Sequence, residues 1–214
     1  MQMNYFIGVD VGTTSTKAVL YDEHARVLDH FNESYSLYRD SSGMAEQDPE
    51  AILNAVEKVI HDAGAKIDFV NEKLLAVSFS SANQSVILLD QHFRPLSRVI
   101  TWADTRAQAV ANHLKRSPEG QQLYIKTGTP IHPMSSLTKI MWLNQAQPEK
   151  VANTAYFGDI KSYLFYQFFG SFKVDVSIAS CTGMMNINTM SWDEQALALT
   201  KVKESQLPAI VNGT

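Results

Sequence analysis

The segment of residues 8–17, GVDVGTTSTK, constrains the fold more than any other part of the sequence. A short apolar run over residues 5–9 precedes it and ends at Asp10, and an extended pattern resumes over residues 17–22. Because small residues rich in Gly and Thr lie between the two runs, the pattern predicts a strand, a turn and a second strand. Residues 27–38 alternate well enough to form a third strand. We therefore expect an antiparallel meander at the start of the chain.

The composition of this turn suits an anion. Gly12 lets the backbone approach an anion closely and adopt a positive φ, while Thr13 and Thr14 add amide and hydroxyl donors. Asp10 would hold a Mg²⁺ ion directly or through water, because Mg²⁺ prefers a few carboxylates together with phosphate oxygens and waters. Lys17 adds a cation nearby. The sequence thus predicts a phosphate-binding turn, with a plain β-hairpin, whose Gly and Thr only form the turn, as the open alternative.

The two commonest nucleotide motifs are absent from this segment. A Walker loop has Lys and then Ser or Thr directly after its second glycine, and a dinucleotide fingerprint has a third glycine that opens a helix. The residues GTTSTK at 12–17 have neither feature, and a strand follows the turn in place of a helix.

The next part of the chain predicts a helix and two further strands. Asp48 and Pro49 look like an N-cap followed by proline at the first helical position, and a helical apolar face follows. Apolar strands are expected over residues 74–79 and 85–89. The five small or polar residues between them, 80–84, lie where a strand leaves the sheet, which is a place that often faces ligand.

The remaining sequence is more helical. Helices are expected over residues 103–115, 137–145 and 159–169, and Gly170 fits a C-terminal cap of the last one. That helix is aromatic on several sides and is therefore expected to be buried. We expect one mixed α/β domain with an embedded helical part.

Composition excludes several classes of function. The 18 Lys and Arg are scattered through a chain of 214 residues with a formal charge of −4, which argues against a nucleic-acid partner. The start lacks the basic region of a signal peptide, and no apolar run approaches the roughly 20 residues that a membrane helix needs. Cys181 is the only cysteine, which excludes an internal disulfide and favours a packed small residue. The histidines fit no metal site. We expect a cytoplasmic protein without a membrane partner.

Several segments, spread in order along nearly the whole chain, carry a resemblance to a known family. The run of residues 7–17 resembles the first phosphate motif of the superfamily of sugar kinases, Hsp70 and actin. The segments that narrow the resemblance to the FGGY carbohydrate kinases are 46–49 (EQDP), 102–106 (WADTR), 127–134 (TGTPIHPM) with Lys139 and Trp142, and 179–186 (ASCTGMMN) with Trp192 and Asp193. Within the family, the sequence is most similar to gluconate kinases and next to xylulose kinases.

The resemblance implies a fold, a reaction and a set of partners. Family members have two ribonuclease-H-like, actin-like ATPase domains, each an α/β unit with a mixed sheet flanked by helices, around a cleft. The first supplies most sugar contacts and the phosphate turn, and the second supplies most of the ATP site and the aspartate that acts as general base. By resemblance the chain is a nearly complete first domain of an ATP- and Mg²⁺-dependent sugar kinase, with a homodimer as the expected assembly. The base then lies beyond Thr214, so the 214 residues alone are expected to be inactive.

The resemblance also assigns roles to single residues. Asp10 matches the aspartate that positions Mg²⁺ and the transferred phosphoryl group, and Gly12, Thr13 and Thr14 match the phosphate-contacting turn.

Five more residues match positions of the sugar pocket: Asn83, Gln84, Trp102, Asp104 and Met134. Asn83 and Gln84 fall where family members hold the acceptor hydroxyls, and both amides can donate and accept. Gluconate and xylulose kinases usually carry Met-His there and glycerol kinases Arg-Glu, so this chain departs from each subgroup.

For the other pocket positions a structural role is the alternative. Trp102 is expected either as a pocket wall against an apolar sugar face or as a core residue. Asp104 either accepts hydroxyl protons or orients its neighbours, and Met134 either contacts the sugar or only packs. Lys139 and Arg106 are expected to be surface residues or members of structural ion pairs.

Two rival functions are considered beside the kinase. One is a non-catalytic sugar-binding module, against which the intact Asp10 and phosphate turn argue. The other is a hydrolase of phosphoanhydrides from the same superfamily, against which the segments 102–106 and 127–134 argue.

Overall fold

The computed structural model describes residues 3–213. Contacts between these residues group them into two compact units, one formed by residues 3–37 and 47–82 and the other by residues 38–46 and 83–213. The chain therefore passes from one unit to the other three times. Each unit is described by itself.

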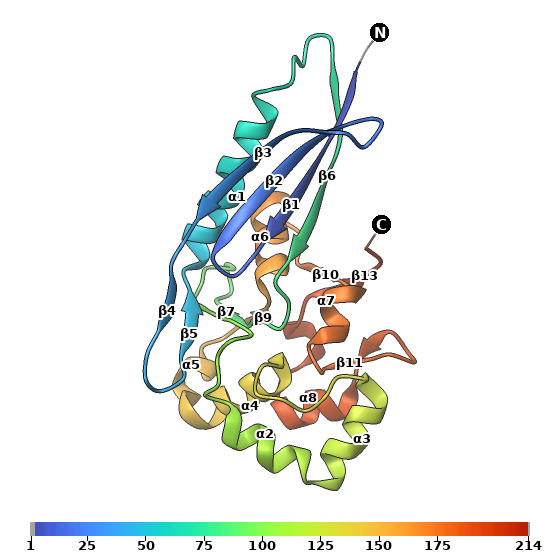
Figure 1. Ribbon diagram of the computed structural model, residues 1–214. Coiled ribbons are helices and arrows are strands. Elements are labelled where there is room, and N and C mark those ends of the chain that lie inside the picture. Colours follow the sequence, from blue (N-terminus) through green and yellow to red (C-terminus); the bar gives the residue numbers. More distant parts are fainter. Residues whose placement is uncertain (1–2, 214) are drawn as a thin grey trace. The chain divides into compact units, whose positions relative to one another are not determined.

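The first unit is a four-stranded sheet with one helix (Figure 1). Its strands are β1 (Asn4–Val11), β2 (Ser15–Asp22), β3 (Val27–Ser34) and β6 (Lys73–Ser81), in the order β3-β2-β1-β6. The first three pair antiparallel as the expected meander, and β6 pairs parallel with β1, so the sheet is mixed. The third strand ends at Ser34, four residues earlier than the alternation predicted.

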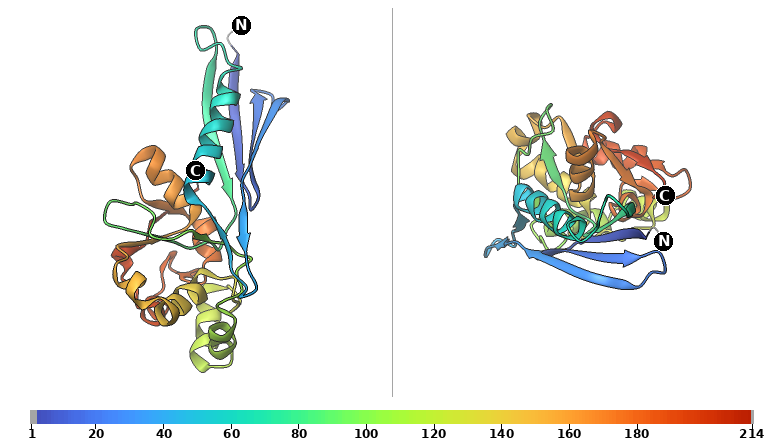
Figure 2. Two further views of the ribbon diagram at one scale, coloured as in Figure 1. Left: turned by 90° about the vertical axis from the view of Figure 1, so that its left-hand side faces the viewer. Right: turned by 90° about the horizontal axis from the view of Figure 1, so that it is seen from above.

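One face of this sheet is apolar. Ile7 and Val9 lie opposite Leu20 and Ala18 in the neighbouring strand, and all four side chains are buried. The helix α1 (Pro49–Gly64) packs against β1, β2 and β3, and Figure 2 shows it lying along one face of the sheet. Since successive side chains in a strand point to opposite faces, the intervening residues of β1 and β2 lie on the other face.

Local sequence explains α1. The Asp48 side chain accepts hydrogen bonds from the N–H groups of Glu50 and Ala51, and Pro49 occupies the first turn. Side-chain capping of this kind satisfies amide groups that the helix itself cannot. The expected four-turn helix is confirmed.

The second unit is mostly helical around one apolar core. Its helices are α2 (Gln108–Lys115), α3 (Pro118–Thr127), α4 (Ser136–Ala146), α5 (Pro148–Ala152), α6 (Ile160–Phe169), α7 (Val176–Cys181), α8 (Glu194–Thr200) and the 3-10 turn η1 (Glu204–Gln206). Small sheets connect them: β4 (Leu37–Arg39), β5 (Ala45–Gln47) and β8 (Val99–Ile100); β7 (Ile87–Leu89) with β9 (Tyr156–Gly158); β10 (Lys173–Asp175) with β13 (Ala209–Val211); and β11 (Met185–Asn186) with β12 (Ser191–Trp192). Buried residues from most of these elements form a single hydrophobic cluster.

Two helix predictions needed correction. The helix expected from residue 103 begins at Gln108, because the Asp104 side chain accepts from the Arg106 N–H and the Asp104 N–H donates to Thr101, which favours turns. The helix α6 has the expected N-cap at Asp159 and C-cap at Gly170, but it is not buried on all sides, since Phe169 is 62% exposed. The helices α3, α5, α7 and α8 were not predicted.

None of the helices in the described part of the chain is both long and apolar enough to span a membrane.

Candidate functional site

The turn between β1 and β2 places an acid and a base side by side. Asp10 and Lys17 are cross-strand partners in the β1–β2 register and both are exposed. Partners in register project from the same face of a sheet, so both side chains lie on the face opposite the buried Val9 and Val11. Lys17 thus accompanies Asp10, as expected of a cation near the turn.

The backbone of the turn is held through its carbonyl groups. The Tyr35 hydroxyl donates to the Gly12 carbonyl at 2.7 Å, and the Gln47 side-chain amide donates to the Thr13 carbonyl at 2.7 Å. The Tyr35 N–H donates to the Thr14 carbonyl at 3.1 Å. Three consecutive carbonyls therefore accept from residues outside the turn, which fixes the turn's conformation. Burial raises the pKa of Tyr35 and the charge of Asp10 adds to the rise, so its hydroxyl stays protonated as a donor.

A side chain larger than that of glycine would be crowded at Gly12. A Cβ at this position would lie 3.0 Å from the Ser15 carbonyl oxygen, to which the Gly12 N–H also donates at 3.0 Å. The expectation of a positive φ at Gly12 was wrong, because this residue is not among the glycines with positive φ. The close approach of the backbone across the turn is the reason for glycine here.

Asp10 suits a magnesium ion bound mainly by water and phosphate. The described residues contain no group of three or more His, Cys, Asp or Glu side chains that could hold a metal ion. Asp10 is exposed and stands beside hydroxyl-bearing turn residues. A single exposed carboxylate fits Mg²⁺, which keeps several waters and takes phosphate oxygens as ligands.

The residues that follow β6 begin the second candidate region. Asn83 is exposed, and its amide donates to the Cys181 sulfur at 3.3 Å. Cys181, expected as a packed small residue, is half-buried and has this contact with Asn83. Gln84 has φ +60°, a backbone conformation that residues other than glycine adopt at a cost in energy. Its Oε1 is buried without a hydrogen-bond partner among the described residues.

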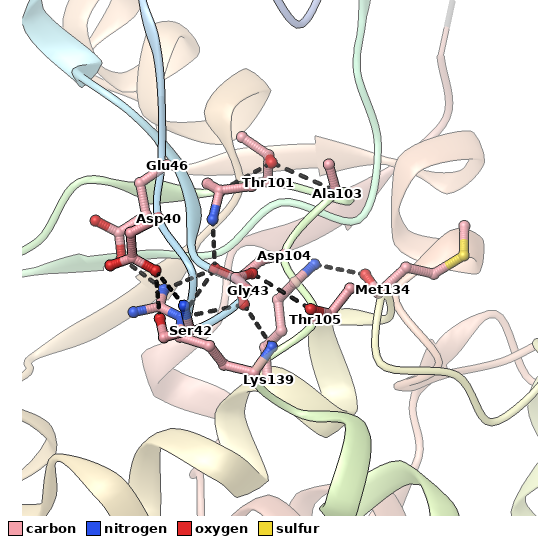
Figure 3. A network of polar contacts seen from close by, with 12 residues as sticks. Asp40, Ser42, Gly43, Glu46, Thr101, Ala103, Asp104, Thr105, Met134 and Lys139 are labelled. Carbon is pink, nitrogen blue, oxygen red and sulfur yellow. Dashed lines mark hydrogen bonds and ion pairs between the residues drawn. The ribbon is translucent and has the colours of Figure 1, made fainter.

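Lys139 lies fully buried beneath Gln84 and Met134. Its Nζ donates to the Gln84 carbonyl at 2.6 Å and to the Met134 carbonyl at 2.5 Å; Figure 3 shows the ammonium meeting the Met134 carbonyl. Burial lowers the pKa of Lys139 to about 7, against a smaller opposing effect of Asp104. The expectation of a surface position for Lys139 was wrong, because 0% of the residue is exposed.

The buried Asp104 forms an ion pair with the half-buried Arg106. Arg106 contacts Asp104 at 2.8 Å and Glu46 at 2.5 Å, and its guanidinium lies 4.5 Å from the ring centre of Trp142. Asp104 also accepts from the Ala45 N–H at 2.9 Å. Burial works to lower the pKa of Arg106, but the two carboxylates raise it overall. We call Glu46, Asp104, Arg106 and Lys139 the buried charge network.

Of the two roles expected for Asp104, contact with a sugar hydroxyl or orientation of its neighbours, the surroundings of Asp104 favour the second. The residue is 1% exposed and both carboxylate oxygens accept from protein donors. This arrangement orients neighbouring residues and leaves no oxygen for a ligand hydroxyl. Trp102, in contrast, is 45% exposed, so the alternative of a core residue was wrong and a pocket wall stays a prediction. Met134 is half-buried.

Sequence reasoning did not find the donors that hold the turn. Tyr35 and Gln47 are 23 and 34 residues away from their carbonyl partners, so no local pattern links them. The only available signal was that Gln47 lies in the segment EQDP at 46–49, which carries part of the family resemblance.

Comparisons with known proteins agree with this geometry. A family model described as the FGGY family of carbohydrate kinases, N-terminal domain, matches residues 5–214. The chain therefore belongs to the FGGY family of carbohydrate kinases, as the motifs indicated, and the expected actin-like α/β fold is confirmed.

Individual relatives give the same result. A gluconokinase of Bacillus subtilis is 41% identical over 212 residues, which cover 99% of this chain and 41% of that protein. The crystal structure of gluconate kinase from Lactobacillus acidophilus has a TM-score of 0.93 at 37% identity and covers 98% of this chain and 42% of that one. A ligand-bound xylulose kinase from the same organism has a TM-score of 0.93 at 38% identity, with 97% and 42% covered. The chain thus spans about two fifths of the length of the relatives it matches.

Proposed function

We propose that the protein to which this domain belongs transfers the γ-phosphoryl group of ATP to a hydroxyl of gluconate. The observation that carries the proposal is the 41% identity with a gluconokinase across 99% of the chain. The exposed Asp10 and Lys17 beside a turn with fixed carbonyls support the phosphoryl-transfer half of the reaction.

The turn binds phosphate in this proposal. Thr13 and Thr14 donate amide and hydroxyl groups, Gly12 gives close access to the backbone, and Lys17 adds positive charge. Asp10 would hold Mg²⁺ directly or through water, and the ion would neutralise charge on the phosphate oxygens. Phosphoryl transfer depends mainly on positioning and on electrostatic stabilisation, which a rigid turn provides.

The acceptor is bound by the second region. Asn83 and Gln84 hydrogen-bond the acceptor hydroxyls, Trp102 packs against an apolar sugar face, and Met134 contributes to the wall. Asp104 acts indirectly, by orienting the backbone and Arg106. The general base is an aspartate of the carboxy-terminal domain of the family. We also propose that the complete protein is a homodimer and acts in the cytoplasm, where ATP and sugar acids are available.

Xylulose is the alternative substrate. The chain is as similar to a xylulose kinase structure as to a gluconate kinase structure, with TM-scores of 0.93 for both. Asn83 and Gln84 also match neither subgroup's usual pair. A neutral ketose is therefore a substrate to test directly beside the sugar acid.

The test is a coupled ADP-release assay of the complete kinase with gluconate, xylulose, ribulose and glycerol. We expect kcat/KM for gluconate to exceed the others by at least about a hundredfold, which corresponds to nearly 3 kcal/mol of discrimination. Preference for xylulose would replace the substrate, and turnover of no polyol would reject the kinase. These 214 residues alone serve as the control and should show no turnover.

A further inference from the structure

Lys139 is the one charged residue among the largest fully buried side chains of the described chain. It lies in α4 and reaches a carbonyl 55 residues earlier in the sequence, that of Gln84, and one five residues earlier, that of Met134. Both carbonyls belong to segments that carry the proposed acceptor contacts. No carboxylate forms an ion pair with Lys139 among the described residues, so its ammonium is used to join two backbone segments.

The Gln84 segment needs such support. Gln84 adopts the left-handed conformation at φ +60°, which persists only where the surrounding structure determines it. The next residue, Ser85, accepts at its carbonyl from Ser136 at 3.2 Å and at its hydroxyl from the Ile160 N–H at 3.1 Å. Lys139 supplies the charged contact in this set, and hydrogen bonds to a charged donor are stronger than neutral ones.

The charges around Lys139 cancel. Asp104 and Arg106 are the ionised groups that act on it, the first attracting and the second repelling its ammonium, and Glu46 pairs with Arg106. The net charge of Glu46, Asp104, Arg106 and Lys139 is therefore zero when Lys139 is protonated and negative when it is neutral. Such a network does not attract an anionic substrate, so any effect of Lys139 on the acceptor must act through the position of the backbone.

We propose that Lys139 is a positioning residue that sets acceptor affinity by fixing the Gln84 and Met134 segments relative to each other. The proposal rests on the proposed function, because the acceptor contacts of these segments are part of it. Removal of the ammonium would free Gln84 from its left-handed conformation and widen the separation of the two segments.

The test compares the complete kinase with its Lys139→Met variant, which keeps the unbranched side chain and removes the ammonium. We expect KM for the acceptor to rise about tenfold or more, while KM for ATP is unchanged and kcat falls less than threefold, because a buried charged hydrogen-bonding group is lost only from the acceptor region. Lys126→Met is the matched control, since Lys126 is a half-exposed lysine of the same unit that contacts Gln195. It should leave both KM values unchanged.

Two readouts do not depend on turnover. Amide hydrogen exchange in Lys139→Met should accelerate over residues 82–86 and 132–136 and remain unchanged in α1. The pKa of about 7 for Lys139 is below its value of 10.5 in an unfolded chain, so the native state releases a proton that the unfolded state keeps. Stability of the wild type should therefore rise between about pH 7 and pH 10 more than that of Lys139→Met.

The possible results separate the two proposals. Equal rises in KM for acceptor and ATP, or faster exchange with unchanged acceptor KM, would overturn the positioning role. If no polyol is phosphorylated, the proposed function fails. In that case, unchanged amide hydrogen exchange at the Gln84 and Met134 segments of Lys139→Met would also reject the proposal that Lys139 fixes these segments. Should Lys139→Met not fold, Lys139→Gln retains an amide donor and is expected to raise acceptor KM by a smaller factor; an unchanged KM would count against the proposal.

Discussion

The turn between β1 and β2 and the buried charge network differ in where their charged side chains lie and in what these side chains contact. In the turn, the charged groups Asp10 and Lys17 are exposed, and neutral donors from Tyr35 and Gln47 hold the backbone. In the network, Asp104 and Lys139 are buried and hold backbone amide and carbonyl groups, and Glu46 and Arg106 are half-buried. The comparison shows two uses of charge. An exposed charged side chain can contact a ligand, whereas a charged side chain with a structural role has its hydrogen-bond partners within the protein.

The largest expected effect breaks the buried charge network. Replacing Arg106 with Met leaves the buried carboxylate of Asp104 and the half-buried carboxylate of Glu46 without their cation, and breaking a buried pair costs about 3–5 kcal/mol of folding free energy. Urea unfolding followed by circular dichroism measures it. Arg94→Met is the control, because Arg94 is 74% exposed in its pair with Asp90 and should change stability by less than about 1 kcal/mol. Equal effects of the two variants would contradict a structural role for Arg106.

The exposed carboxylate should show the reverse pattern. Asp10→Asn in the complete kinase is expected to lower kcat by about a hundredfold to a thousandfold, because in the proposed reaction this carboxylate would hold the Mg²⁺ ion that neutralises charge on the phosphate oxygens. Its melting temperature should stay within about 2 °C of the wild type, since Asp10 is exposed. A Mg²⁺ titration at fixed ATP adds a direct check. Full activity of Asp10→Asn would remove the residue from the proposed site.

A smaller effect tests how the turn is held. Gln47→Leu keeps the approximate volume of this buried side chain but removes the donor to the Thr13 carbonyl. We expect stability to fall by about 1–2 kcal/mol and kcat/KM for ATP to fall about fivefold to tenfold. Gln108→Leu is the matched control, because Gln108 is exposed and its side-chain amide donates to the Asn112 side chain on the same helix. Loss of stability without any change in ATP kinetics would show that the conformation of the turn does not matter for phosphate binding.

Local signals in the sequence predicted the elements that have local causes. Asp48 and Pro49 start α1, and Asp159 and Gly170 bound α6, because capping residues act within a few positions of the helix end. The same signals occur at α3, where Ser117 caps the helix, Pro118 follows and Gly128 ends it, although that helix was not predicted. The apolar periodicity of this segment is weak, so the helix was missed although the residues that begin and end it were both present.

The candidate site was predicted only in part, for a reason that is physical. The register of β1 and β2 follows from the turn, so the shared face of Asp10 and Lys17 follows from the sequence. The burial of Lys139 does not, because its partner Gln84 is 55 residues away and nothing in the sequence near Lys139 distinguishes it from a surface lysine. The contact of Asp104 with the Ala45 N–H is hidden in the same way, since Ala45 lies 59 residues earlier.

Glu46 and Gln47 are adjacent in β5, but one belongs to the buried charge network and the other holds the turn between β1 and β2. Glu46 pairs with Arg106, and the adjacent Gln47 donates to Thr13, because successive side chains of a strand point in opposite directions. Inserting or deleting one residue in this three-residue strand would exchange the two side chains and disconnect both partners at once. We therefore expect this strand to tolerate substitutions better than changes of length.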